Sequence, residues 1–147
     1  YPALRKTAWA IQDRGAFLDD KRIVPRPYSG EKNETLISAG FMPGTTHLFP
    51  VLQKNYANVL VLGSFVCEAL LVAEGKLKAY VHTGATPFDI AAAMILVRES
   101  GGIAIGIKTG DLDLSQPKIP IILARELRLA EEIRSIVLAN QKTEKQK

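Results

Sequence analysis

The sequence predicts an α/β fold, in which helices pack on a layered sheet, with a mixed α+β arrangement as the alternative. From residue 57 onward, short apolar segments alternate with longer segments of helical character, as in strand–helix–strand units. The chain has 147 residues, of which 47% are hydrophobic and 23% are charged. This balance is typical of one globular domain with a sizeable core.

The first forty residues are expected to be rich in strands. A polar turn at residues 19–21 separates two short apolar segments, which predicts a hairpin. The strands expected in this region are residues 6–11, 17–18, 22–24 and 34–39. Residues 25–33 contain proline and glycine and are expected to form a loop. Thr45 and Thr46 can cap a helix over residues 47–54.

Strands and helices alternate in the rest of the chain. The expected strands are residues 57–62, 77–81, 103–105 and 119–123. The expected helices are residues 65–74, 87–100 and 125–139, the last with one apolar face. Gly75 and the pair Gly101–Gly102 are expected to end the first two helices, because glycine commonly follows a helix. Loops are expected over residues 83–86 and 106–118.

We expect residues 1–147 to form a single domain. It would comprise a strand-rich entry over residues 1–40, an α/β layer over residues 57–140 and a flexible tail over residues 141–147. Because the chain begins with Tyr1 and not with methionine, we expect it to be a piece of a longer protein.

Charge and composition limit the partners. The net charge of +4 is mild, and no basic motif interleaved with aromatic residues occurs, so nucleic acid is not expected as a partner. No uninterrupted apolar stretch of 18 residues and no signal-peptide pattern occurs, so we expect no membrane partner and a cytoplasmic location. The single cysteine, Cys67, excludes an internal disulfide and suits a reducing compartment.

The segment 79–97 is the most informative part of the chain. Its one charged residue is Asp89, which the apolar run 90–97 follows. Such a run is normally buried, and a carboxylate at its head must be hydrogen-bonded, paired or metal-bound because burying a bare charge is costly. Thr86 and Pro87 form a helix-start signal. On local grounds a capping box, in which Asp89 reaches back to the amide of Thr86, is favoured over metal binding.

Two further places could contribute to a site. Gly63 and Ser64 stand between a strand and a helix, where free backbone amides can hold an oxyanion or a hydroxyl. His82 stands at the end of a strand, and loops at strand ends of α/β folds line ligand sites. On local grounds alone, an ordinary N-cap at Ser64 and a surface histidine at position 82 are the favoured alternatives. The residues thus indicate an α/β domain with a candidate anion or metal site.

Three ordered motifs resemble the inositol monophosphatase family. PFDIAAAMILVRESGG, residues 87–102, resembles the C-terminal signature, in which a tryptophan–aspartate pair opens a helix that ends in glutamate, alanine and two glycines. LGSFVCEALLVAEGKLKAYV, residues 62–81, resembles the family's Gly-Ser/Thr turn, helix and strand, and RGAFLDDKRI, residues 14–23, resembles its hairpin. The resemblance extends to archaeal fructose-1,6-bisphosphatases. It implies the C-terminal portion of an αβαβα sandwich of the sugar-phosphatase type.

The resemblance implies Mg²⁺-dependent hydrolysis of a phosphomonoester on inositol or a sugar, by metal-assisted phosphoryl transfer. By position, Asp89 matches the family's C-terminal metal-ligand aspartate. Gly63, Ser64 and the amide of Phe65 match the turn that contacts substrate hydroxyls. His82 falls where inositol-specific members usually carry a glutamate that touches the ring hydroxyls, which argues against inositol specificity.

The departures from the family pattern concern the other metal ligands, which are a helix-borne glutamate and an Asp-Pro-x-Asp-Gly-Thr/Ser loop. This chain contains no Asp-Pro dipeptide. One aspartate cannot build a tight Mg²⁺ site, because the ion requires octahedral oxygen ligands. We therefore expect no catalytic residue in this chain and no appreciable hydrolysis by the chain alone.

Two other readings remain open. The first is a non-catalytic truncated paralogue that acts as an oligomeric interaction module, because loss of half the fold would leave a sheet edge or an apolar face uncovered. On that ground we expect a homo-oligomer, most simply a dimer. The second is a generic anion-binding α/β domain.

Overall fold

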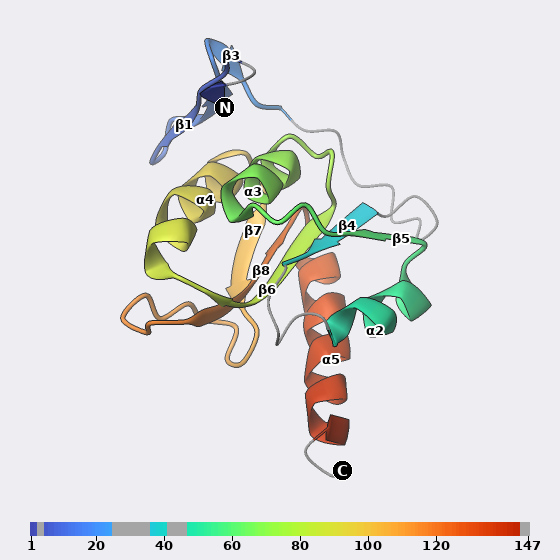
Figure 1. Cartoon of the computed structure of the whole chain (residues 1–147). Coiled ribbons are helices and arrows are strands. Elements are labelled where there is room, and N and C mark those ends of the chain that lie inside the picture. Colours follow the sequence, from blue (N-terminus) through green and yellow to red (C-terminus); the bar gives the residue numbers. More distant parts are fainter. Residues whose placement is uncertain (3–4, 25–35, 41–46, 145–147) are drawn as a thin grey trace.

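The computed structural model describes residues 1–2, 5–24, 36–40 and 47–144 (Figure 1). Within these residues the strands form a three-stranded sheet, in the order β1-β2-β3, and a five-stranded sheet, in the order β5-β4-β6-β8-β7. The strands are β1 (Ala8–Ile11), β2 (Gly15–Leu18), β3 (Lys21–Arg22), β4 (Leu36–Ala39), β5 (Asn58–Leu60), β6 (Ala79–Ala85), β7 (Ile103–Gly106) and β8 (Ile119–Ala124). The helices are α2 (Leu48–Asn55), α3 (Phe65–Ala73), α4 (Pro87–Glu99) and α5 (Leu127–Glu144).

The five-stranded sheet is the middle layer of the fold. Strands β4, β5 and β6 run parallel, whereas β8 pairs antiparallel with both β6 and β7. Helices α3 and α4 cover one face of the sheet, and α2 and α5 cover the other (Figure 1). Strand β8 supplies both cores, because Ile121 and Leu123 pack toward α3 and α4 while Ile122 packs toward α2 and α5. This arrangement confirms the predicted α/β class.

The three-stranded sheet lies on the outer side of α3 and α4 (Figure 1). It is an antiparallel meander, in which Trp9 of β1 stacks on Phe17 of β2 with ring centroids 4.2 Å apart. Glu99, at the end of α4, accepts hydrogen bonds from the backbone N–H groups of Asp13 (2.9 Å) and Gly15 (2.8 Å) in the β1–β2 turn. The glutamate near the end of the C-terminal signature therefore joins this sheet to the α/β layer.

Local signals in the sequence account for the ends of α4. Thr86 precedes Pro87 as the N-cap, and its Oγ1 accepts a hydrogen bond from the N–H of Asp89 at 3.4 Å. At the other end Gly101 has φ +82°, a conformation that favours glycine, and the N–H of Gly102 donates to the carbonyl of Val97 at 2.8 Å. The glycine pair therefore ends the helix as predicted.

The structure corrects several expected boundaries. The loop expected at residues 83–86 is wrong over most of its length, because β6 continues through a bulge to Ala85, which pairs with Ile119. The last helix ends at Glu144 and not at residue 139, so it includes residues 141–144 of the expected tail. The first expected strand of the α/β half, residues 57–62, shortens to β5. The expected loop at residues 25–33 lies outside the described residues, as do both threonines expected to cap α2.

Among the described residues, no helix combines the length and the apolar character needed to cross a membrane.

Candidate functional site

The candidate site residues meet at the end of the five-stranded sheet where its parallel strands have their carboxyl termini, which is called the carboxyl edge here. Because β4, β5 and β6 are parallel, their carboxyl ends lie along the same edge, where open α/β sheets place their ligands. Gly40 follows β4 and the Gly63–Ser64 corner follows β5. His82 lies in the middle of β6, one residue beyond the pairing of that strand with β4. Helices α3 and α4 both begin at this edge, and Asp89 lies in the first turn of α4.

Asp89 is half-buried and holds its helix cap through side chains. Its Oδ2 accepts a hydrogen bond from Thr86 Oγ1 at 2.7 Å. The expected bond to the amide of Thr86 is not formed, since Thr86 donates through its hydroxyl. Among the described residues Oδ1 has no hydrogen-bond partner and no main-chain nitrogen binds the carboxylate. The capping role thus leaves part of this carboxylate free to bind another group.

The His82 ring is held on several sides. Its Nδ1 accepts a hydrogen bond from the N–H of Gly84 at 3.1 Å. The ring of Phe65 meets it edge-on with centroids 5.6 Å apart, and that of Tyr80 does so at 6.1 Å. A Cβ on Gly40 would lie 2.2 Å from His82 Cδ2, so the ring fills the space that the glycine leaves.

The electrostatics of this edge favour a neutral imidazole. Burial lowers the pKa of His82, and the negative charge of Asp89 opposes that shift without reversing it. The same carboxylate contributes to the raised pKa of Tyr80, after burial and Glu68. Asp89 therefore acts electrostatically on both Tyr80, which is in the core, and His82.

The corner before α3 is open. Gly63 has φ +78°, and a Cβ built there would meet no atom of the described residues within 4 Å. Ser64 occupies the N-cap position of α3 but makes no side-chain capping hydrogen bond, and it is exposed. The ordinary N-cap expected at Ser64 is thus present in position only, and the α3 cap does not use the hydroxyl.

Glu68 is a buried polar residue that the sequence analysis missed. It is 0% exposed, and its Oε1 accepts hydrogen bonds from the Ser38 hydroxyl and from the N–H of Leu62 at 3.1 Å. Its Oε2 is buried and has no partner among the described residues. Glu68 therefore ties β4 to the segment that leads into Gly63. An acid within the apolar helix 65–73 was the signal that could have found it.

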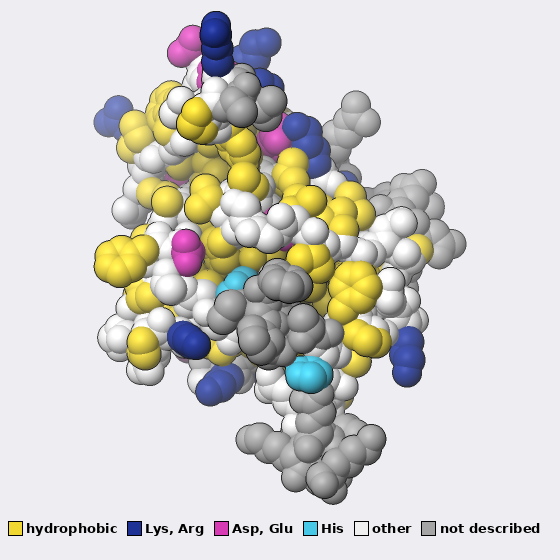
Figure 2. All heavy atoms as spheres, in the orientation of Figure 1, with side chains coloured by type: hydrophobic (Ala, Val, Ile, Leu, Met, Phe, Trp, Pro, Cys, Tyr) yellow, Lys and Arg dark blue, Asp and Glu magenta, His cyan; other side chains and the backbone are white. Residues whose placement is uncertain are grey.

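The described residues offer few ligands for a metal ion. Within them no group of three or more histidine, cysteine, aspartate or glutamate side chains is placed to hold an ion. Asp89 supplies one carboxylate of the kind that Mg²⁺ prefers. Hydrophobic side chains gather over the face that carries α3, α4 and β6 (Figure 2). The exposed large hydrophobic residues of the described part include Phe88, which precedes Asp89 in the sequence and is 92% exposed, and Leu62, which is 51% exposed.

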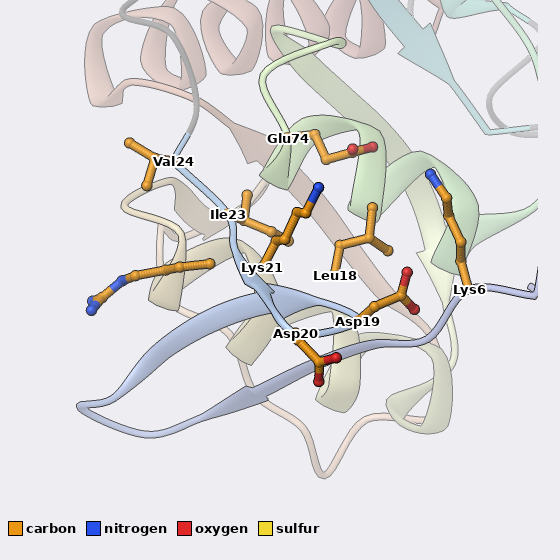
Figure 3. A pocket seen from close by; sticks show the side chains of 9 residues that line it. Lys6, Leu18, Asp19, Asp20, Lys21, Ile23, Val24 and Glu74 are labelled. Carbon is orange, nitrogen blue, oxygen red and sulfur yellow. The ribbon is translucent and has the colours of Figure 1, made fainter.

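A separate hollow of about 450 Å³ lies between the three-stranded sheet and the end of α3. In Figure 3 the side chains of Lys6 and Lys21 extend toward the same side of this hollow as Glu74. Glu74 already pairs with Lys76 at 2.9 Å. The lining carries three basic and three acidic residues, so it selects no ligand charge: Lys6, Lys21, Arg22, Asp19, Asp20 and Glu74. None of the candidate site residues lines it.

Comparison with known proteins places this geometry in a family. Human inositol monophosphatase 2 is 32% identical over 127 residues, which cover 79% of this chain and 43% of that protein. A fructose-1,6-bisphosphatase/inositol-1-monophosphatase of Thermotoga maritima is 28% identical over 102 residues, which cover 69% of this chain and 40% of that protein. The Nus factor SuhB of Xylella fastidiosa is 25% identical over 141 residues, which cover 89% of this chain and 51% of that protein. The chain thus spans about half, or somewhat less, of the length of these relatives.

Solved structures show the same fold. The IMPase of Thermotoga maritima superposes with a TM-score of 0.82 at 25% identity, over 97% of this chain and 55% of that one. The inositol monophosphatase of Anabaena also gives a TM-score of 0.82, at 21% identity, over 94% and 58%. The sequence model of the inositol monophosphatase family matches residues 1–143. The chain therefore belongs to the inositol monophosphatase family.

Proposed function

We propose that this chain forms the sugar-binding part of a Mg²⁺-dependent phosphomonoesterase that acts on inositol or sugar phosphates. Asp89 would bind the metal ion, and Gly63, Ser64, Phe65 and His82 would contact the substrate. The observation that carries the proposal is the meeting of these residues at the carboxyl edge of three parallel strands. A ligand at this edge would lie between the N-termini of α3 and α4, which favour anions.

The metal fits Asp89 but not this chain alone. One carboxylate, with an oxygen that has no partner among the described residues, suits a hard cation, whereas Mg²⁺ needs several such oxygens. When bound, Mg²⁺ would polarise the phosphate oxygens and acidify a water. The described residues provide binding and orientation only. We therefore propose that hydrolysis requires carboxylates beyond those described here.

Each residue at the edge has its own part in binding. The uncapped Ser64 hydroxyl and the amides at the start of α3 would hold substrate oxygens. Phe65, packed against His82, would exclude water from one side of the sugar. Glu68 would keep the Gly63 corner in place through its hydrogen bond to the N–H of Leu62.

Metal titration of the chain tests the role of Asp89. Mg²⁺ titrated into ¹⁵N-labelled protein should shift the amides around residue 89 with millimolar affinity, because one carboxylate holds the ion weakly. Asp89→Asn should abolish these shifts. Asp20→Asn removes an exposed carboxylate of the β2–β3 turn and is the matched control. Unchanged Mg²⁺ binding in Asp89→Asn would exclude this residue from the site.

Phosphate release from inositol 1-phosphate and fructose 1,6-bisphosphate tests the second half of the proposal. Pure chain with millimolar Mg²⁺ should release phosphate at a negligible rate. Robust turnover that Asp89→Asn abolishes would overturn the claim that further carboxylates are needed, while it would support the site itself.

A second candidate function is self-association, which would suit a non-catalytic module. Strand β1 is an edge of the three-stranded sheet and leaves Trp9 40% and Ile11 47% exposed. We propose a dimer in which this edge contacts a second copy, in a reducing compartment such as the cytoplasm, where the lone Cys67 stays a thiol. Light scattering at high micromolar concentration should give the mass of a dimer, and a clean monomer would count against it.

A further inference from the structure

The inference concerns which kind of oxygen His82 can bind, and it rests on the proposed function of this edge. One ring nitrogen of His82 is already committed, because Nδ1 accepts from the N–H of Gly84 at 3.1 Å. An acceptor nitrogen carries no proton. In a neutral imidazole the proton must then be on Nε2, which makes that atom a donor only.

Packing prevents the ring from exchanging its two nitrogens. A half-turn about its axis would place Cδ2 against the Gly84 amide and forfeit that hydrogen bond. The Cδ2–Nε2 side of the ring lies over Gly40, where a Cβ would come within 2.2 Å of Cδ2 and 3.0 Å of Nε2. Phe65 and Tyr80 meet the ring edge-on. The donor is therefore fixed at the end of β4, on the ligand side of the sheet.

Protonation of the ring would not turn Nε2 into an acceptor. A charged imidazole would lose the bond from Gly84, since Nδ1 would become a donor facing a donor. Burial also lowers the pKa of His82. The ring therefore presents a single Nε2–H, which has no hydrogen-bond partner within the part of the chain that the structure describes.

A fixed donor favours an oxygen that has no hydrogen of its own. We propose that His82 donates from Nε2–H to a second anionic group of the substrate, so that this edge prefers sugar phosphates with such a group over those with hydroxyls alone. Hydrogen bonds to charged acceptors are stronger than those to neutral ones. The positive end of the α3 dipole lies at the same edge and favours the same ligands.

The second anionic group could be a phosphate or a carboxylate, and three ligands separate these sources. Fructose 1,6-bisphosphate carries a second phosphate, 6-phosphogluconate carries a carboxylate, and inositol 1-phosphate carries hydroxyls only. Binding is followed by ¹⁵N-resolved NMR with millimolar Mg²⁺, through the amides of Ser64 and Phe65 and the ring nitrogens of His82. One or both of the doubly anionic ligands should bind more tightly than inositol 1-phosphate.

Two variants test whether His82 causes the preference. His82→Phe keeps a ring but removes the donor. It should weaken binding of the preferred ligand roughly tenfold to a hundredfold, and binding of inositol 1-phosphate by a smaller factor, because a hydroxyl accepts a weaker hydrogen bond than an anion does. His82→Gln keeps an amide N–H donor near the place of Nε2, and it should retain most of the preference. Dispersed amide spectra confirm that each variant is folded.

The outcomes are distinct. A protonated Nδ1 in the free protein, seen directly in the ring ¹⁵N shifts, overturns the inference without any variant. So does a preference that His82→Phe leaves intact, although Asp89-dependent binding would then still support the proposed function. If none of the three ligands shifts Ser64 or Phe65, the proposed function fails and the inference fails with it.

Discussion

The five-stranded layer and the three-stranded sheet are held in different ways. The layer is covered on both faces, and the neighbouring residues Ile122 and Leu123 of β8 are each 0% exposed on opposite sides. The small sheet is covered on one face only, and Ile11 is 47% exposed on β1. Glu99, which is half-buried, fastens the β1–β2 turn with two hydrogen bonds. The candidate site thus stands on a layer that is packed on both faces, whereas the small sheet packs through one face only, with Ala16 in the core beside α4.

Truncation of one isoleucine in each region should give the largest contrast. Ile122→Ala should lower the free energy of unfolding by about 2–5 kcal/mol, because it opens a cavity in a closed core. Ile11→Ala is the matched change in the small sheet and should cost about 1 kcal/mol or less, since that side chain is half in water. Urea unfolding measures both. Equal losses of unfolding free energy in the two variants would show that the two regions are packed equally well, against our expectation.

Gly40→Ala should produce an intermediate effect that is confined to the layer. The new Cβ would overlap the His82 ring, and overpacking of this kind costs about 1–3 kcal/mol. We expect the ring to move and the amide of Gly84 to lose its acceptor, which NMR would detect as a shift of that amide. Gly63→Ala is the control for steric overlap, because no atom in the described part of the chain lies within 4 Å of the added Cβ, although its φ of +78° adds strain. An unmoved His82 ring would show that Gly40 does not set its position.

Acid should loosen the small sheet before the layer. Backbone hydrogen bonds from the β1–β2 turn lower the pKa of Glu99 below its ordinary value of 4.5. The unfolded chain therefore binds this proton more readily than the folded one. The stability that Glu99 contributes is complete above pH 4.5 and declines as the pH falls through the lowered folded value.

Amide exchange at Asp13 and Gly15 measures this transition. Exchange at these two positions should accelerate below about pH 4, relative to the intrinsic rate, while Leu123 stays protected. Glu99→Gln should give fast exchange at all pH values with a small change in the global unfolding midpoint. If Leu123 opens together with Gly15, the two regions form one cooperative unit and the comparison fails.

The helices of the layer were predictable because their ends carry local signals. Pro87 and the glycines after Ala73 and Glu99 act within a few residues, and α3 and α4 start where expected. The end of β6 was not predictable. Thr83 and Gly84 have the composition of a turn, yet pairing of Ala85 with Ile119 on β8 continues the strand. Strand pairing over such a separation overrides local preference.

The candidate site was also only partly predictable from the sequence. Position in the sequence placed Asp89 in the first turn of a helix and the Gly63–Ser64 corner before another. It gave no sign that Phe65 would lie edge-on to His82, with centroids 5.6 Å apart. The role of Glu68 was also hidden, because its partners Ser38 and Leu62 lie on other elements.

By itself the sequence indicated the family through the resemblance of three ordered motifs. It determined the α/β class and the residues that begin α3 and α4 through periodicity and capping signals, which act within a few positions of each other. The tertiary structure alone decided which atoms of those residues remain available. It turned Nδ1 of His82 toward Gly84 and brought Glu99 to Gly15 across 84 residues. It also left one oxygen of Asp89 without a partner in the part of the chain that the structure describes. Hydrogen-bond partners of this kind are set by packing between distant segments, which no local pattern encodes.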